Sequence, residues 1–480
     1  MSEELGMQTK KENFGGWYLE VVEKAEIVDT RYRVKGFEIY LPTGISIARE
    51  ITRRFEDLLE RAGHKPVMFP VVIPKSALSK ETEHIRGFEN EVFWITYGGK
   101  KKLQEKLCLR PTSETAFYPM YSLWIRSHSQ LPFKLYQSVA VYRHETKMTK
   151  PLFRGREFLW IETHTAQKTF EDADFQVKED MEIFQKVVTE ILGIPFLLFK
   201  RPDWDKFPGA EKTYAFETLL PDGKSLQIGT THNLGEKFSR VFKIQYLDEK
   251  GGKKFVNQTC FGPGISRLLA AIVAVHGDDK GLIIPPAIAP IQIVIVPIHT
   301  GDTKAKVLEK CGEILGRLEE KEFRIHLDDR EDKTPGFKFH EWELKGVPLR
   351  IEIGPKDIEQ GKVTFVRRDF LERFAIDEDK LEEFVLETLD SIGFQLQKRA
   401  QELISVSDAR DYKELKNKLK DSGFVRIPHC MRESCAKKLK TDTGIEVRGM
   451  LFEHKISPKI KKCAVCNKGA KELVCVARAY

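Results

Sequence analysis

Two segments that alternate like β-strands, joined by a basic loop, constrain the fold of this chain more than any other feature. The first reads LYQSVAVYR over residues 135–143, and the second reads REFLWIETH over residues 156–164. Successive side chains of a strand point to opposite sides, so Val139, Val141 and Arg143 share a face, which Glu145 extends. The shared face of the second segment carries an aromatic ring, a carboxylate and an imidazole: Trp160, Glu162 and His164. The pattern predicts two strands that form the floor of a pocket.

The loop between these strands adds positive charge above that floor. It contains Lys147, Lys150 and Arg154. An aromatic wall, a carboxylate, an imidazole and a guanidinium beneath a cationic loop suit a small zwitterion beside a phosphate chain. The alternative is a surface hairpin with a solvated outer face, but this would expose Trp160 to water without a reason.

These residues resemble a known family. The R-x-E pairing of Arg143 with Glu145, followed by the basic loop and the returning strand, resembles motif 2 of class II aminoacyl-tRNA synthetases. Within that class, the RPTSE run at residues 110–114 and the REFLWIETHTA run at residues 156–166 resemble the prolyl-tRNA synthetase family. The resemblance implies ATP-dependent ligation of L-proline to tRNA(Pro) through a prolyl-adenylate, with release of AMP and pyrophosphate.

The chain is long enough for about three domains of roughly 100 to 200 residues each. The resemblance implies a mixed α/β (α+β) fold with an antiparallel-sheet catalytic domain over residues 1–285, an α/β anticodon-binding domain over 286–395 and a small zinc-type α/β domain over 396–480. The excess of seven positive charges is compatible with a polyanionic partner but does not require one.

Composition argues against a secreted or membrane protein. The chain has 8 cysteines in 480 residues, and half of them cluster near the C-terminus, so a disulfide scaffold is not expected. The first sixteen residues contain no apolar signal segment. The long uncharged run at residues 281–301 is interrupted by four prolines, which would break a membrane helix. We therefore expect a cytoplasmic protein without a membrane span.

A helix followed by a proline-containing strand precedes the pocket. Apolar residues at steps of three and four predict an amphipathic helix over residues 46–62, with Gly63 as its C-terminal stop. The strand-like PVMFPVVIP run follows at residues 66–74. The order resembles motif 1 of class II synthetases and implies a homodimer, although any helix–strand unit would look similar.

The Thr112-Ser113-Glu114 triplet admits two interpretations. Thr112 or Ser113 would cap the following helix, with Glu114 as a first-turn carboxylate. Alternatively, Glu114 supplies the negative charge that matches the secondary ammonium of proline, while Thr112 accepts a hydrogen bond. The resemblance favours the second interpretation, and the proline-binding residues it implies are Thr112, Glu114, Arg143, Trp160, Glu162, His164 and Cys260. Many family members carry serine-tryptophan where Cys260 and Phe261 stand.

Residues 213–242 predict another hairpin, which turns at the PDG of residues 221–223. In the family, the matching positions face ATP, and Glu217 becomes a candidate ligand for Mg²⁺. A lone histidine such as His232 is as often structural as functional. The ATP-binding residues that the resemblance implies are Arg143, Glu145, Arg154, Gln227, Thr230, His232 and Arg267.

The segment 257–275 resembles motif 3. Gly262 and Gly264 open an apolar helix, and Arg267 lies in its first turn, where it suits the far end of a triphosphate. The resemblance assigns catalysis to Arg143, Glu145 and Arg267. The substrate carboxylate is already ionised and needs no general base, so the site must supply alignment and charge neutralisation. The interval between motifs 2 and 3 is too short for the editing domain of bacterial relatives.

Strands alternate with helices in the following region, which predicts a small α/β domain. It resembles the anticodon-binding domain of the subgroup that contains prolyl and threonyl enzymes. Guanines of a proline anticodon would be read by Arg, Lys and carboxylate groups. By analogy of position, the candidates are Glu343, Arg350 and Lys356, and a solvated charged rim is the alternative.

The C-terminal region contains two cysteine pairs, Cys430-x4-Cys435 and Cys463-x2-Cys466. Four thiolates converging on Zn²⁺ would stabilise a lysine-rich segment that is poor in apolar residues, and four protein ligands make the zinc structural. The substitutes, should one ligand fail, are His429, His454 and Cys475. The sequence ends in Tyr480, as in the archaeal and eukaryotic-type prolyl enzymes, whose terminal carboxylate approaches the active site; a disordered tail is the simpler alternative.

Two rivals remain for the function. One is a synthetase for another small amino acid such as threonine. Against this rival, the sequence shows no cysteine-histidine set near the pocket that could bind a catalytic zinc. The other is a synthetase-like RNA-binding protein without catalysis. The presence of Arg143, Glu145 and Arg267 together argues against the second rival, because RNA binding alone requires none of them in that register.

Overall fold

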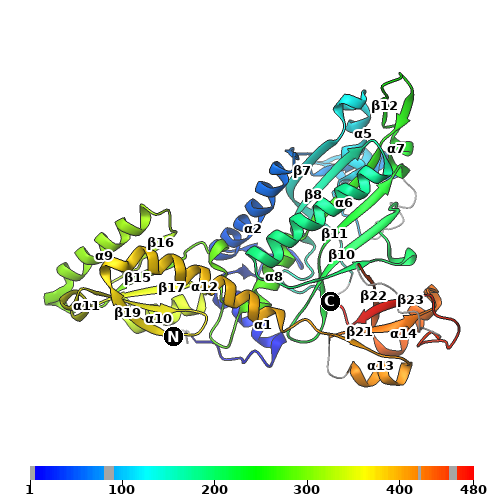
Figure 1. Cartoon of the computed structure of the whole chain (residues 1–480). Coiled ribbons are helices and arrows are strands. Elements are labelled where there is room, and N and C mark those ends of the chain that lie inside the picture. Colours follow the sequence, from blue (N-terminus) through cyan, green and yellow to red (C-terminus); the bar gives the residue numbers. More distant parts are fainter. Residues whose placement is uncertain (1–5, 81–90, 147, 420–422, 453–461) are drawn as a thin grey trace.

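The computed structural model describes residues 6–80, 91–146, 148–419, 423–452 and 462–480. Its large sheet combines strands that lie far apart in the sequence (Figure 1). The strand order is β20-β21-β23-β22-β9-β10-β11-β14-β8-β7-β3. A separate five-stranded sheet belongs to the domain at the left of Figure 1. The mixed α/β fold class expected from the sequence is confirmed.

The predicted strand pair is present, toward the β3 end of this sheet. β7 (Phe133–Tyr142) and β8 (Glu157–Gln167) pair antiparallel, with Val139 opposite Trp160. The sheet continues through three further antiparallel strands, β14 (Asn257–Pro263), β11 (Ser225–Gly235) and β10 (Lys212–Leu219). The hairpin predicted at the PDG turn is therefore confirmed, and Gly223 there has a φ of +74°, a conformation that favours glycine.

Three helices cover the sheet and bury the main hydrophobic core. They are α2 (Pro42–Arg61), α6 (Phe170–Gln185) and α8 (Ile265–His276). Helix α6 packs against β8, β11 and β14, helix α8 packs against β8 and β11, and helix α2 packs against both helices and against β3. Their core includes the rings of Trp17, Phe55, Phe184 and Phe261. Because α8 is apolar on all sides, it lies buried along its length. The packing fixes where the strands, and hence the pocket residues, stand.

The predicted amphipathic helix is α2, with two differences at its ends. It begins at Pro42, whose fixed φ suits the first helical position, and it ends at Arg61 before Gly63, which has a φ of +84°. The proline-rich run that follows is not one strand, because its prolines interrupt the ladder. It forms two short strands, β3 (Lys65–Pro66) and β4 (Val72–Pro74).

The other elements of this domain frame the sheet. The helices are α1 (Phe14–Lys24), α3 (Lys75–Leu78), α5 (Glu114–Trp124) and α7 (Lys237–Phe242). The strands are β1 (Val28–Asp29), β2 (Ile39–Tyr40), β5 (Trp94–Gly98), β6 (Lys101–Leu109), β9 (Leu197–Lys200), β12 (Gln245–Leu247) and β13 (Lys253–Phe255).

The next domain has the strand–helix alternation that the sequence predicts. Its sheet order is β16-β15-β17-β18-β19, in which β15 pairs parallel with β16 and β17, and the remaining pairs are antiparallel. The strands are β15 (Ile293–Pro297), β16 (Ile325–Leu327), β17 (Leu349–Ile353), β18 (Lys362–Arg367) and β19 (Arg373–Asp377). The helices are α9 (Lys304–Glu319), α10 (Pro335–Leu344), α11 (Pro355–Gln360) and α12 (Leu381–Gln401).

Helix α12 connects this domain to the rest of the molecule. Leu381 and Val385 pack in the core of the five-stranded sheet, whereas Ile392 and Leu396 pack on Ile283 of the catalytic part. The helix is continuous to Gln401, so the domain boundary expected at residue 395 falls inside it.

The C-terminal elements do not form an isolated sheet. They are β20 (Val406–Asp408), α13 (Tyr412–Lys418), β21 (Phe424–His429), α14 (Glu433–Thr443), β22 (Glu446–Leu451) and β23 (Glu472–Ala477). Strand β22 pairs antiparallel with β9, with Met450 opposite Lys200 and Leu451 opposite Phe199. Figure 1 shows the resulting proximity of the C-terminal domain to β10 and β11. In the described residues, no helix is long and apolar enough to cross a membrane.

Candidate active site

A cavity of about 440 Å³ lies over the central strands. Its lining contains most of the residues that the sequence assigned to proline and ATP: Thr112, Glu114, Arg143, Glu145, Arg154, Trp160, Gln227, Thr230, His232, Cys260 and Arg267. The fold thus brings together side chains from β6 to α8. Of the predicted residues, Glu162, His164 and Glu217 do not line this cavity, and Lys147 and His454 lie outside the described residues.

The triplet at the start of α5 forms one side of the cavity. Thr112 Oγ1 donates to Glu114 Oε2 at 2.6 Å, and the Cys260 thiol donates to Glu114 Oε1 at 3.3 Å. The helix starts after Ser113, whose side chain makes no capping hydrogen bond. Glu114 lies in the first turn, as the capping interpretation expects, but the side-chain cap is absent. Thr112 instead donates to Glu114 and so orients its carboxylate.

Glu162 and His164 lie in a buried layer behind this surface. Glu162 accepts hydrogen bonds from the backbone N–H of Ser113 at 3.1 Å and from Gln137 Nε2 at 2.8 Å. Its Oε2 lies 3.2 Å from His164 Nε2, and both side chains are fully buried. Burial alone would raise the pKa of Glu162, but the hydrogen bonds from His164, Ser113 and Gln137 hold it below its usual value. The two residues support the pocket wall from behind.

Trp160 forms the aromatic wall of the cavity, where Arg143 and Gly262 lie against its ring. The guanidinium of Arg143 lies 5.0 Å from its ring centre and 5.4 Å from that of Phe158. A side chain at Gly262 would come within 2.5 Å of the indole, so only glycine fits there. The surface-hairpin alternative is therefore wrong. Arg143 also donates from Nε to the carbonyl of Pro111 at 3.1 Å, which directs it toward the triplet.

Guanidinium groups gather at the opposite end of the cavity. Arg267 donates from Nε to the carbonyl of Phe153 at 3.0 Å and from Nη1 to that of Gln227 at 2.9 Å. Burial, together with the nearby charges of Arg143 and Arg154, lowers the pKa of Arg267 to about 10. Arg154 lies 3.7 Å from the Glu145 carboxylate. Three clustered cations at a partly enclosed site suit a polyanion such as a triphosphate.

His232 is fixed between two threonines of the sheet. Its Nδ1 lies 3.0 Å from Thr213 Oγ1 and its Nε2 lies 2.9 Å from Thr230 Oγ1. Burial, with the neighbouring His164 and Arg201, lowers its pKa to about 3, so the ring is neutral at physiological pH. A neutral imidazole at the cavity wall serves as a hydrogen-bonding group and carries no charge.

Glu217 does not fit the magnesium role that the sequence suggested. Its carboxylate is fully buried and accepts hydrogen bonds from two guanidinium groups, Arg201 at 2.6 Å and Arg448 at 2.7 and 2.8 Å. A carboxylate surrounded by two cations is electrostatically unsuited to a divalent ion. The expectation fails because the partner Arg448 comes from a region far away in the sequence.

The sequence did not identify Arg201 and Arg448 as pocket residues, although both line the cavity, and Tyr480 lines it as well. The Tyr480 ring stacks on Phe153 at 4.9 Å with an angle of 9° between the planes. Its hydroxyl contacts Asp222 and Lys150, and its backbone N–H donates to the carbonyl of Ser225. The tail is therefore docked on the active site, and the disordered-tail alternative is wrong.

One group of potential metal ligands lies at the cavity wall and in the buried layer behind it. Ligand atoms of Glu114, His164 and Cys260 all lie within 4.8 Å of one another. The expectation that no cysteine–histidine set stands near the pocket is therefore wrong. Burial and the Glu114 carboxylate raise the pKa of the Cys260 thiol well above its usual value, so the thiol is protonated and donates to Glu114.

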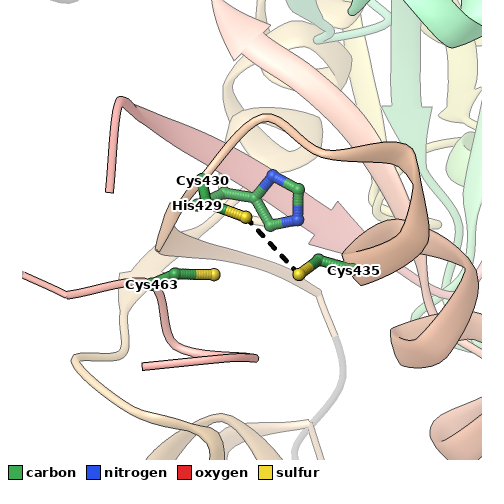
Figure 2. A group of neighbouring side chains, drawn as sticks. All are labelled: His429, Cys430, Cys435 and Cys463. Atoms are coloured by element: carbon green, nitrogen blue, oxygen red, sulfur yellow. Dashed lines mark hydrogen bonds between the residues drawn. The ribbon is translucent and has the colours of Figure 1, made fainter. Parts of the chain in front are cut away.

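Three cysteines of the C-terminal domain converge with a histidine (Figure 2). Ligand atoms of His429, Cys430, Cys435 and Cys463 lie within 4.8 Å of one another. Cys430 Sγ lies 3.4 Å from Cys435 Sγ and 3.7 Å from Cys466 Sγ. Tetrahedral thiolates at about 2.3 Å from zinc stand about 3.8 Å apart, so the sulfur spacing fits this ion. Hydrogen bonds to Cys430, from the Arg432 backbone and Cys435 among others, overcome its burial and lower its pKa to about 6.

The tautomer of His429 bears on the fourth ligand. Its Nδ1 accepts a hydrogen bond from the backbone N–H of Met431 at 3.1 Å, and burial lowers its pKa to about 4. A neutral ring that accepts at Nδ1 carries its proton at Nε2, which then has no lone pair for a metal. This arrangement favours Cys466 as the fourth ligand.

The three anticodon candidates differ in their surroundings. Arg350 is buried and bonds both Glu343, at 3.1 Å, and Glu352, at 3.0 Å, while its guanidinium lies 4.2 Å from the ring centre of Phe339. Lys356 is exposed at the start of α11. The structure therefore brings Glu343 and Arg350 together in one partly buried pair and places Lys356 on the surface.

Comparison with known proteins agrees with this geometry. Residues 93–276 match the class II tRNA synthetase core domain (G, H, P, S and T), residues 292–388 an anticodon-binding domain, and residues 412–480 the prolyl-tRNA synthetase C-terminal domain. The proline–tRNA ligase of Thermofilum pendens is 48% identical over 100% of both chains. That of Thermococcus kodakarensis is 46% identical over 99% of this chain and 100% of its own.

A solved structure extends the agreement to three dimensions. Giardia lamblia prolyl-tRNA synthetase in complex with prolyl-adenylate superimposes with a TM-score of 0.94 at 35% identity, over 99% of this chain and 100% of its own. These similarities confirm the class II catalytic domain and the anticodon-binding domain that the sequence predicted. From its sequence, its fold and the residues of its cavity, this chain belongs to the prolyl-tRNA synthetase family.

Proposed function

We propose that this chain ligates L-proline to tRNA(Pro) in two steps, with prolyl-adenylate as the intermediate. The observation that carries the proposal is that Glu114, Arg143 and Trp160 face the same cavity as Arg154 and Arg267. A carboxylate and an aromatic wall suited to a small ammonium compound thus lie beside a guanidinium cluster suited to a triphosphate. The Giardia lamblia relative was solved with prolyl-adenylate, which supports the same intermediate here.

In the first step, alignment replaces acid–base catalysis. Glu114 binds the secondary ammonium of proline, and the face of Trp160 covers the ring. An oxygen of the proline carboxylate attacks the α-phosphorus of ATP, the bond from that phosphorus to the bridging oxygen breaks, and pyrophosphate leaves. Arg143 holds the carboxylate and the α-phosphate, and Arg267 holds the γ-phosphate, so both neutralise the charge that develops.

In the second step, the terminal ribose hydroxyl of the tRNA attacks the carbonyl carbon of prolyl-adenylate. The bond between that carbon and the phosphate oxygen breaks, the hydroxyl proton departs, and AMP leaves. Magnesium enters as the counter-ion of ATP. Glu217 takes no part in this step, because its oxygens accept hydrogen bonds from Arg201 and Arg448. The zinc that Cys430, Cys435, Cys463 and Cys466 would hold is structural, because four thiolates leave no open position.

Amino-acid-dependent ATP–pyrophosphate exchange tests this function. Proline should support exchange at a rate at least about 10²-fold above threonine and serine, because the pocket offers them no equivalent ring contact. Alanine and cysteine serve as smaller competitors. Strong exchange with threonine would favour the rival synthetase, and tRNA binding without any exchange would leave the RNA-binding rival.

We further propose that Lys356 contacts the anticodon, together with the preformed pair of Glu343 and Arg350. Lys356→Ala should lower the charging efficiency for tRNA(Pro) about tenfold, since one base contact contributes about 1–3 kcal/mol. Exchange without tRNA should not change, because the residue lies in a different domain from the cavity. Lys321→Ala, which removes another exposed lysine of this domain, is the matched control. Equal charging by both variants would assign Lys356 to the solvated rim.

A homodimer built through the region around α2 is also part of the proposal. Between β3 and β4 the chain exposes Met68 and Val71, at 86% and 38%, and exposed apolar side chains of this kind mark contact surfaces. Sedimentation should give about twice the chain mass of 55.4 kDa, and Met68→Lys should lower it. A monomer at micromolar concentration would reject this. All eight cysteines lie in the described part of the chain and none forms a disulfide there, which supports a reducing compartment such as the cytoplasm.

A further inference from the structure

A buried ion pair joins the C-terminal domain to the catalytic sheet at the edge of the cavity. Arg448 on β22 donates to Glu217 on β10 from Nη2 at 2.7 Å and from Nε at 2.8 Å. Arg448 is 7% exposed and Glu217 is fully buried, yet Arg448 also lines the cavity. Glu446, which lines the cavity as well, bonds Arg448 Nη1 at 3.0 Å. The C-terminal domain therefore supplies part of the wall of a pocket formed by another domain.

From Glu217 the contacts continue to the nucleotide end of the cavity. Arg201 Nη2 donates both to Glu217 at 2.6 Å and to Gln227 Oε1 at 2.7 Å. Because the Gln227 oxygen accepts from Arg201, its amide Nε2–H₂ group is the part left to face the cavity as a donor. The backbone carbonyl of Gln227 in turn accepts a hydrogen bond from Arg267 Nη1 at 2.9 Å. Two side chains, Glu217 and Arg201, therefore link Arg448 to the Gln227 amide. Gln227 in turn links them to Arg267 of motif 3.

Two β-bulges orient the side chains of the Arg448–Glu217 ion pair. The register of β22 against β23 shifts between Val447 and Gly449, so Arg448 is the extra residue. The register of β10 against β11 shifts between Phe216 and Glu217, beside Gln227. Bulges re-aim side chains and are common next to active sites. Gly449 adopts a φ of +133° with the backbone of Lys200 close by, which fixes the approach of β22 to β9.

We infer that Arg448 is a positioning residue for ATP: through Glu217 and Arg201 it holds the Gln227 amide as a donor to the nucleotide. This inference rests on the proposed function, since it assigns the Gln227 end of the cavity to ATP. Without Arg448, the buried Glu217 carboxylate has Arg201 as its remaining cation and draws that guanidinium away from Gln227. The proline end of the cavity depends on Glu114 and Trp160, which contact none of these residues in the interactions described above.

The test separates the two substrates. In pyrophosphate exchange, Arg448→Met should raise KM for ATP about tenfold or more, as expected for the loss of charged hydrogen bonds, and leave KM for proline within about twofold. Arg448→Lys keeps the charge but cannot reach both Glu217 oxygens, so its KM for ATP should be intermediate. Arg426→Met, which removes another ion-paired arginine of the C-terminal domain, is the control.

Each outcome decides the inference. A selective rise in KM for ATP that Arg448→Lys partly reverses supports it, whereas equal changes for both substrates, or a fall in kcat alone, overturn it. If Arg448→Met does not fold, the same comparison is made with Arg448→Lys. If the wild-type chain shows no exchange, the proposed function fails separately. Calorimetric titration with ATP then decides: weaker binding to the variant supports the inference and equal binding overturns it.

Discussion

Replacing Arg143 with alanine is expected to reduce proline-dependent pyrophosphate exchange about 10²–10³-fold, because removal of a single preorganised donor to a developing charge has this effect in other enzymes. Arg143 is held by the Pro111 carbonyl and by the faces of Trp160 and Phe158, at the junction of the proline and phosphate ends of the cavity. The rate is measured at saturating ATP and proline, so that kcat is compared directly.

Two variants give this prediction its controls. Arg143→Lys keeps the positive charge but loses the planar fork and the stacking on Trp160, so we expect it to recover only a small part of the rate. Arg410→Ala removes an exposed arginine that pairs with Glu414 in the C-terminal domain and should leave the rate unchanged. A lysine variant with the full rate would show that charge alone suffices and would remove the geometric role.

Loss of the zinc cluster should have the largest effect on stability. Cys430→Ser is expected to abolish zinc retention and to lower the thermal midpoint sharply, since a structural zinc contributes on the order of 10 kcal/mol to the folding of a small domain. The cluster stands at the end of β21, which pairs with β23, and β23 pairs with the β22 strand that carries Arg448. We therefore expect activity to fall with zinc content, measured by metal analysis and exchange on the same sample.

The fourth ligand can be identified in the same experiment. Cys466→Ser should lose zinc as Cys430→Ser does, whereas His429→Gln should retain it, because the His429 proton is at Nε2. Cys475→Ala is the matched control, since Cys475 is a buried thiol of the same domain outside the cluster. Zinc loss in His429→Gln but not in Cys466→Ser would reverse the assignment. Thiols must lose their protons to bind zinc as thiolates, so retention should weaken as pH falls.

The sequence predicted the local part of the site well. The alternation around Arg143 and Trp160 and the helix that begins after Gly264 follow from short-range periodicity, and the structure has both. Thr112 and Glu114 were correctly chosen as pocket residues, but the direction of their hydrogen bond could not be read from spacing alone. Glu162 and His164 share the predicted face of the strand, yet that face is covered by α5 at their positions, so they support the pocket from a buried layer.

The contacts between segments that are distant in the sequence could not be predicted. Arg448 is 231 positions from its partner Glu217, and no periodic pattern marks such a pair. The pairing of β22 with β9 depends on a short strand and on a bulge at Arg448, both of which are set by tertiary contacts. The Glu217 prediction failed for this reason. Arg201 lies 16 positions from Glu217, so its omission has no such long-range cause.

The pairing of β22 with β9 also has a consequence for shortened versions of the chain. Leu198 and Phe199 satisfy their backbone groups partly through Phe452 and Leu451. A chain that stopped before β22 would leave β9 as an open edge strand, with unpaired N–H and C=O groups beside the apolar side chains of Leu197 and Phe199. Such an edge adds a strand from a neighbouring molecule. The catalytic part by itself is therefore expected to self-associate in solution, so its C-terminal domain acts as a barrier to aggregation as well as a wall of the active site.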